Sequence, residues 1–174
     1  MIAYLILLLA VVSRVVPHPY SVTMVGGSLL YFGARRSSWQ VAIAVAALAV
    51  TDFCLTHFMY GYSFVLVSYL PTWAWYAGAC FIGKGLLGRE TTMLRGVGAV
   101  VGSASAFFLV SNFAVWMTST MYPHSLAGLG ACYAMGVPYY GNDLVSTAAV
   151  VSVLFGVPVL VKSFADGESL ATRA

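Results

Sequence analysis

Long apolar runs, broken by short polar stretches, form the main pattern of the chain. A helix needs about 20 apolar residues to cross the hydrocarbon core of a bilayer, and the longer runs here approach or reach that length. The pattern predicts an all-α integral membrane protein, a six-transmembrane-helix bundle that forms a single domain over residues 1–174. We expect its spans at about residues 1–16, 20–34, 38–58, 63–83, 95–116 and 142–161.

Proline and glycine set the expected ends of these spans. Pro17 predicts an end to the first span, because proline cannot donate a backbone hydrogen bond to a continuing helix. The span over residues 20–34 is short and contains Gly26-Gly27, so we expect it to be irregular or to lie inside the bundle. Between the last two spans we expect a short outer helix over residues 125–135 that ends before Pro138.

Composition and charge support the membrane interpretation and indicate an orientation. The chain is 61% hydrophobic and only 7% charged, whereas an ordinary soluble domain has about 25% charged residues. With the N-terminus inside, all of its eight lysines and arginines except Arg14 fall in cytoplasmic connections or the C-terminal tail. This bias predicts a multi-pass protein of the bacterial inner membrane with both termini in the cytoplasm. The scattered basic residues form no patch suited to nucleic acid.

Under this orientation, several titratable residues gather at the outer end of the bundle. They are His18, His57, His124, Asp52 and Asp143. Such groups cost free energy in a bilayer unless they meet water, a partner or a ligand. We therefore expect a binding cavity in the outer half of the bundle.

Six residues are our candidates for substrate binding in that cavity: Arg14, His18, Asp52, Asn112, His124 and Tyr139. Arg14 is the lone outer basic residue, and it could either pair with Asp52 or anchor a ligand. Asn112 lies inside a predicted helix, where a carboxamide needs a partner. Tyr139, beside Pro138, suits the wall of a pocket for a flat organic ligand. Asn142 and Asp143, in contrast, are explained by an N-cap and a first-turn acid at the start of the last span.

The sequence contains no catalytic motif and no convincing metal site. It lacks H-E-x-x-H, G-x-S-x-G and a nucleotide-binding loop, so we expect no enzymatic activity and no bound cofactor. The three histidines share no helix face and fix no metal geometry. Cys54, close to Asp52, is only a weak candidate metal ligand.

Several short motifs occur in a specific order along the chain. They are R-V-V-P-H-P from Arg14, S-N-F-A-V-W from Ser111, Tyr122-Pro123, Gly128-Leu129, Cys132-Tyr133, Pro138-Tyr139-Tyr140 followed by Asn142, and Leu154-Phe155-Gly156. In these motifs the chain resembles an uncharacterised family of small bacterial membrane transport proteins. That family is related to the substrate-binding S components of energy-coupling-factor (ECF) vitamin transporters. The resemblance covers most of the chain.

The resemblance implies an S-component-like fold with a substrate pocket near the outer surface. The implied partners are a small-molecule substrate, membrane lipid, an ECF coupling subunit and its ATPases. The chain departs from the pattern at two points. Its first span lacks the alanine pair that many S components use to dock their coupling subunit, and Thr147 stands where the family often has an acidic residue.

The leading functional prediction is a substrate-binding membrane subunit for uptake of a small nutrient. The nutrient would be vitamin-like, aromatic or heterocyclic, and separate partners would supply the energy. One alternative is cobalamin uptake resembling solitary S components of the BtuM type, with Cys54 as a cobalt ligand. Others are a membrane-embedded enzyme that uses His57, His124 and Asp143, and a non-transporting scaffold subunit without an outer cavity.

Overall fold

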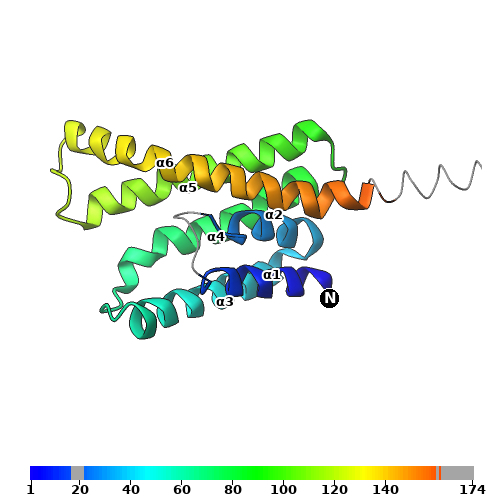
Figure 1. Cartoon of the computed structure of the whole chain (residues 1–174), viewed down its shortest axis with the longest axis horizontal. Coiled ribbons are helices and arrows are strands. Elements are labelled where there is room, and N and C mark those ends of the chain that lie inside the picture. The colour runs from blue at the N-terminus through cyan, green and yellow to red at the C-terminus, as the bar shows by residue number, and fades with distance from the viewer. Residues whose placement is uncertain (17–21, 160, 162–174) are drawn as a thin grey trace, which may run out of the picture.

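The computed structural model describes residues 1–16, 22–159 and 161, and within these residues every regular element is helical (Figure 1). The six α-helices are α1 (Ile2–Ser13), α2 (Val25–Arg35), α3 (Val41–Cys54), α4 (Leu66–Leu87), α5 (Met93–Thr118) and α6 (Leu126–Val151). A 3-10 turn, Ser38–Gln40, precedes α3, and π-helical turns extend α3 over Leu55–Met59 and α6 over Ser152–Gly156. The predicted all-α fold is confirmed.

Three of the described helices are long and apolar enough to cross a membrane. They cover Ser38–Met59, Met93–Thr118 and Leu126–Val159. The outer surface is also apolar, since Leu5, Leu8 and Leu9 of α1 are each more than half exposed. Apolar side chains on such a surface are typical of a protein that faces lipid.

The helices form three layers along the long axis of the molecule (Figure 1). The α5–α6 hairpin forms one outer layer, α2 and α4 form the middle layer, and α1 and α3 form the other outer layer. We call the end where α2 and α4 end and α5 begins the basic end, after Arg35, Arg36, Lys84, Arg89 and Arg95. The opposite end, where α3 leads to α4 and α5 to α6, is the cavity end.

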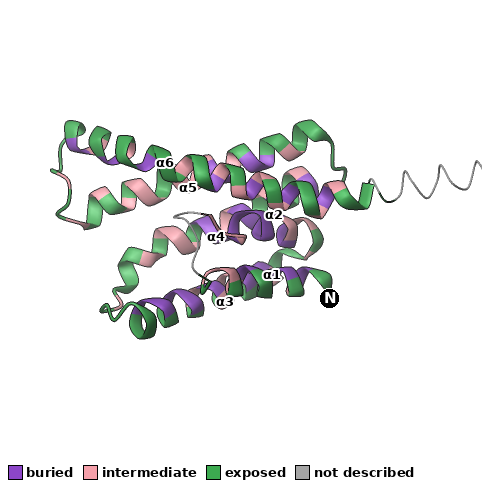
Figure 2. Ribbon diagram, viewed as in Figure 1, coloured by how far each residue is buried: buried purple, intermediate pink, exposed green. Residues whose placement is uncertain are grey.

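The short helix α2 lies at the centre of the bundle. It contacts α1, α3, α4, α5 and α6, and its residues from Val25 to Leu30 are all buried (Figure 2). Glycines bring α2 and α4 together: a Cβ at Gly33 would collide with the carbonyl of Cys80, and one at Gly83 with the carbonyl of Leu30. The expectation that this segment lies inside the bundle is confirmed, and backbone-to-backbone packing explains how it fits there.

The last helix differs most from the sequence prediction. The expected short helix over 125–135 and span over 142–161 are wrong as separate elements, because α6 begins at Leu126 and helix continues to Val159. Pro138 lies inside α6 and does not end it, which membrane helices tolerate when neighbouring helices hold the backbone in place.

The start of α6 also corrects a second expectation. Ser125 is the N-cap, and its hydroxyl accepts a hydrogen bond from the Gly128 amide at 3.2 Å. Asn142 and Asp143 therefore lie in the middle of a helix, and the N-cap interpretation of this pair is wrong.

The close contact between α2 and α4 can be tested with two alanine substitutions in α4. We expect Gly83→Ala to lower the free energy of unfolding by about 3 kcal/mol, because the new methyl group would meet the rigid backbone of Leu30. Gly85→Ala is the matched control, since a Cβ there meets nothing within 4 Å and alanine favours helix over glycine. Thermal unfolding of the purified protein in detergent measures both effects, and equal losses from both variants would contradict this packing.

Candidate functional site

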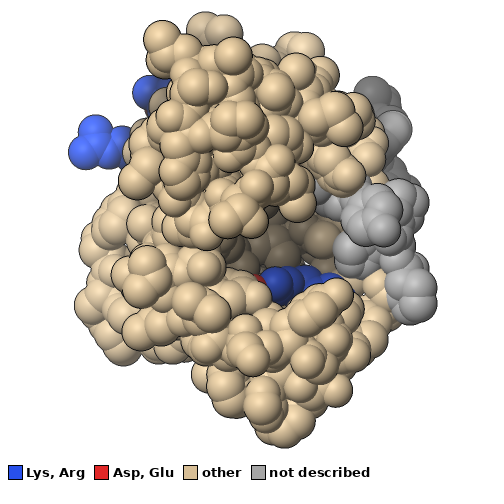
Figure 3. Space-filling model, turned by 90° about the vertical axis from the view of Figure 1, so that its left-hand side faces the viewer, with Lys and Arg blue, Asp and Glu red and all other residues tan. Residues whose placement is uncertain are grey.

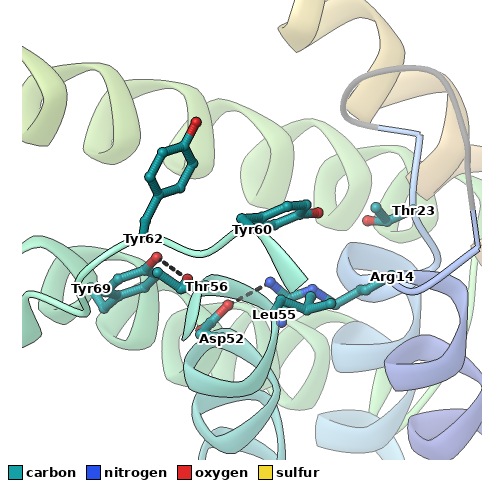
Figure 4. A pocket seen from close by; sticks show the side chains of 8 residues that line it. All are labelled: Arg14, Thr23, Asp52, Leu55, Thr56, Tyr60, Tyr62 and Tyr69. Atoms are coloured by element: carbon teal, nitrogen blue, oxygen red, sulfur yellow. Dashed lines mark hydrogen bonds and ion pairs between the residues drawn. The ribbon is translucent and has the colours of Figure 1, made fainter. Parts of the chain in front are cut away.

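A polar cavity of about 290 Å³ opens at the cavity end of the bundle. Its lining residues are Arg14, Thr23, Asp52, Leu55, Thr56, Tyr60, Tyr62 and Tyr69 (Figure 4). The space-filling view of this end shows the hollow, with basic atoms and a trace of acidic atoms inside it (Figure 3). The cavity thus combines a charged interior with an aromatic wall.

Two short helices leave room for this cavity. Helix α1 has 12 residues and α2 has 11, so at 1.5 Å per residue each is roughly 16–18 Å long, far less than the ~30 Å of a bilayer core. Both occupy the basic end, whereas α3 to α6 continue to the cavity end (Figure 1). The cavity lies at the end of the bundle that α1 and α2 do not reach.

The carboxylate of Asp52 forms the floor of the cavity. Asp52 lies in the last turn of α3 and is only 3% exposed. Its Oδ1 accepts a hydrogen bond from Arg14 Nη2 at 2.5 Å, and its Oδ2 accepts one from Trp73 Nε1 at 2.8 Å. The hydroxyl of Tyr76 lies 3.3 Å from both carboxylate oxygens and donates to them. Donors from the end of α1 and from α4 therefore solvate one buried acid.

Arg14 follows the last residue of α1 and completes the floor. Its Nη1 donates to the carbonyl of Leu48 at 3.4 Å, one turn before Asp52. The side chain is 18% exposed, so one face of the guanidinium reaches the cavity. Because Arg14 and Asp52 have opposite charges, the floor is polar but carries no net charge.

The cavity wall comes from the chain between α3 and α4. There α3 passes into the π-helical turn and reaches Gly61, whose φ of 67° is unfavourable for residues with a side chain. This turn presents Tyr60 and Tyr62, which are 57% and 71% exposed. Deeper in the wall, the hydroxyls of Thr56 and Tyr69 form a 2.5 Å hydrogen bond. The wall therefore offers aromatic rings and hydroxyl groups together.

The structure brings two of the six sequence candidates together and separates the others. Arg14 and Asp52 meet on the cavity floor, whereas His18 lies outside the described residues. Asn112, His124 and Tyr139 do not line the cavity. Arg14 and Asp52 thus form the charged centre of this cavity, whereas most of its wall comes from residues that were not among the candidates.

The three candidates that do not line the cavity lie on α5, on α6 and in the connection between these two helices. Asn112 donates to the carbonyl of Phe108 at 2.8 Å and packs so closely against α6 that Gly136 has no room for a side chain. His124 is exposed, and its ring centroid lies 5.5 Å from that of Trp116. Tyr139 lies on α6 and is 46% exposed.

Three of the residues that sequence reasoning missed share one helix face. Tyr69, Trp73 and Tyr76 follow one another at spacings of four and three residues along α4, which places them on the same side of a helix. All three face Asp52 or the cavity. That spacing, opposite an acid at the end of α3, was the signal that could have found them.

The metal and enzyme alternatives receive no support from this arrangement. Cys54 is exposed and does not line the cavity. His57 stacks on Phe53, with ring centroids 5.6 Å apart, and so belongs to a different contact from His124. Across the described ranges, no three histidine, cysteine or acidic side chains lie together as a metal site would require.

A second buried acid lies outside the cavity lining. Asp143, in α6, is 5% exposed, and its Oδ2 has no hydrogen-bond partner among the described residues. Thr147, one turn further along, is 1% exposed and packs against Gly26 of α2. The sequence interpretation placed Asp143 at an outer helix end, whereas the structure places it within the bundle.

The ion pair on the floor can be tested by a double-mutant cycle. We expect Asp52→Asn or Arg14→Gln alone to lower the free energy of unfolding by about 3 kcal/mol, because each leaves the partner charge poorly compensated. The double variant should lose about 1–3 kcal/mol less than the sum of the two single losses. Unfolding in detergent gives all four values, and strict additivity would show that the two side chains do not depend on each other.

Comparison with known proteins identifies a family but no activity. No match is found among curated proteins. None is found among solved structures. Residues 1–168, nearly the whole chain, match a family of unknown function, DUF6580. The chain therefore belongs to the DUF6580 family.

Proposed function

We propose that this chain is a membrane-embedded subunit that binds a small aromatic or heterocyclic solute for uptake. The observation that carries the proposal is the cavity, because an apolar helical bundle holds a buried ion pair and three tyrosines at one of its ends. Grouping polar side chains there costs free energy that a purely structural bundle would avoid. Concave sites with a few convergent polar groups are the usual form of small-molecule sites.

The chemistry of the cavity favours a flat ligand without net charge. Its volume, about 290 Å³, lies at the small end of the ligand-pocket range of roughly 300–1,000 Å³, so one or two rings fit best. The tyrosine rings provide stacking surfaces, and the hydroxyls of Thr23, Thr56 and Tyr69 can donate or accept hydrogen bonds. A cation would compete with Arg14 for Asp52, and an anion would compete with Asp52 for Arg14.

The distribution of charge supports an orientation with the cavity facing away from the cytoplasm. Five described basic residues lie at the basic end, and Arg14 is the described basic residue toward the cavity end. Positive side chains favour the cytoplasmic side of a membrane. We therefore propose a multi-pass protein of the bacterial inner membrane with cytoplasmic termini.

Transport would need partners that supply energy. The resemblance to ECF S components supports a coupling subunit and ATPases in this role. In this proposal the chain itself selects the solute, and the partners drive its release to the cytoplasm.

Solute binding can be measured through Trp73, whose indole contacts Asp52 on the cavity floor. We expect at least one compound from a panel of pyrimidines, pyridines and pteridines, which have one or two rings, to change the tryptophan fluorescence of the purified protein. That change should be lost in Trp73→Phe, while thermal stabilisation by the same compound remains. A panel in which no compound stabilises the protein or changes its fluorescence would count against the proposal.

Two tyrosine variants test whether the solute occupies the cavity. Tyr62→Ala removes an exposed ring from the wall and should weaken binding about five-fold, as expected for the loss of roughly 1 kcal/mol of aromatic contact. Tyr139→Ala is the matched control, because Tyr139 is also exposed but lies outside the lining. Equal weakening by both variants would place the solute elsewhere.

A further inference from the structure

A second hollow lies at the basic end, on the side of the bundle. It is a groove of about 710 Å³ between the beginning of α5 and the end of α6. Met93, Val97 and Val101 form its wall on α5, and Leu144, Ala148 and Phe155 form its wall on α6. These side chains are apolar, so the groove differs in chemistry from the cavity at the other end.

Small residues keep the groove open. Gly96 of α5 and Gly156 after α6 both line it, and a Cβ at either position would meet nothing within 4 Å. The two helices pack closely elsewhere, as Asn112 and Gly136 show. The groove is therefore a local separation of α5 and α6 that the side chains of the described residues do not fill.

Two arginines neighbour residues that line the groove, although neither lines it itself. The guanidinium of Arg35 lies 5.3 Å from the ring centroid of Phe155, which lines the groove. Arg95 immediately precedes Gly96, and its Nη1 donates to the carbonyl of Glu90 at 3.2 Å. Both arginines are exposed, one from α2 and one from α5. An apolar groove with cationic groups at its end matches the two parts of an anionic phospholipid.

We propose that this groove binds an anionic phospholipid, with an acyl chain between α5 and α6 and the phosphate beside Arg35 and Arg95. The acyl chain would cover the apolar wall, and guanidinium groups bind phosphate through charge-assisted hydrogen bonds. A transmembrane helix in the same groove would cover the apolar wall but bring no phosphate to the arginines. The charge at the groove therefore favours a lipid over a second helix.

Headgroup recognition can be tested with two lipids that differ in charge. Native mass spectrometry of the full chain in neutral detergent should show tighter binding of phosphatidylglycerol than of phosphatidylcholine. About five-fold preference per arginine is expected, which corresponds to roughly 1 kcal/mol for each basic contact. Arg35→Gln should reduce this preference about five-fold. Arg36→Gln is the control, because that guanidinium lies over the ring of Tyr4 in α1, 4.7 Å from its centroid.

Filling the groove tests where the acyl chain lies. Gly96→Leu should lower phosphatidylglycerol binding at least ten-fold, because the new side chain would occupy the open space of the groove. Gly102→Leu is the control in the same helix, since its Cβ is equally unobstructed but Gly102 does not line the groove. Equal affinity for the two lipids, or equal effects of the two leucines, would overturn the proposal. Loss of a dimer in Gly96→Leu without loss of lipid would instead assign the groove to a second copy of the chain.

Discussion

The buried carboxylate of Asp52 is the constraint on which the cavity end depends. A charge in an apolar bundle is tolerated only when opposite charge and hydrogen-bond donors surround it. Arg14 provides the charge, while Trp73 and Tyr76 provide further donors. Because these donors come from the end of α1 and from α4, satisfying the acid also joins α1 and α4 to α3. The same contacts fix the depth of the cavity floor, since the guanidinium lies where α1 ends.

Packing at the basic end explains why the cavity is at the other end. Helix α2 contacts α4 through backbone atoms at Gly33 and Gly83, and it meets α6 where Gly26 packs against Thr147. Such contacts bring helix axes close together and fill the middle layer densely. However, α2 begins only at Val25, so this dense packing stops part-way along the bundle. Beyond it the longer helices enclose a space that no helix of the described residues fills.

The sequence predicted the all-α fold, and it offered the pairing of Arg14 with Asp52 as one of two alternatives, because both follow from which residues a bilayer tolerates. The sequence-based prediction was wrong where the outcome depends on which way a side chain faces or on which helix packs against it. Pro138 predicted a break by local rules, but the packing of Asn112 on Gly136 and the 3.0 Å hydrogen bond between Ser105 and Tyr140 hold α6 against α5 through this region. Tyr69 and Trp73 were missed because an aromatic belt accounts for such residues without distinguishing those that face inward. Asn112 was placed on the correct helix, but it faces α6 instead of the cavity.

The two buried acids, Asp52 and Asp143, have different surroundings near the start of α2. Gly26 packs against Thr147 and Gly27 against Val150, so α2 and α6 run in the same direction here. Asp143 lies one turn before Thr147 and hence towards the N-terminus of α2, where the helix dipole has its positive end. That end is equivalent to roughly half a unit charge, whereas Arg14 brings a full charge to Asp52. Thr23, just before α2, lines the cavity with Arg14 and Asp52. The start of α2 therefore adjoins the cavity through Thr23, and it adjoins the turn of α6 that follows Asp143 through Gly26.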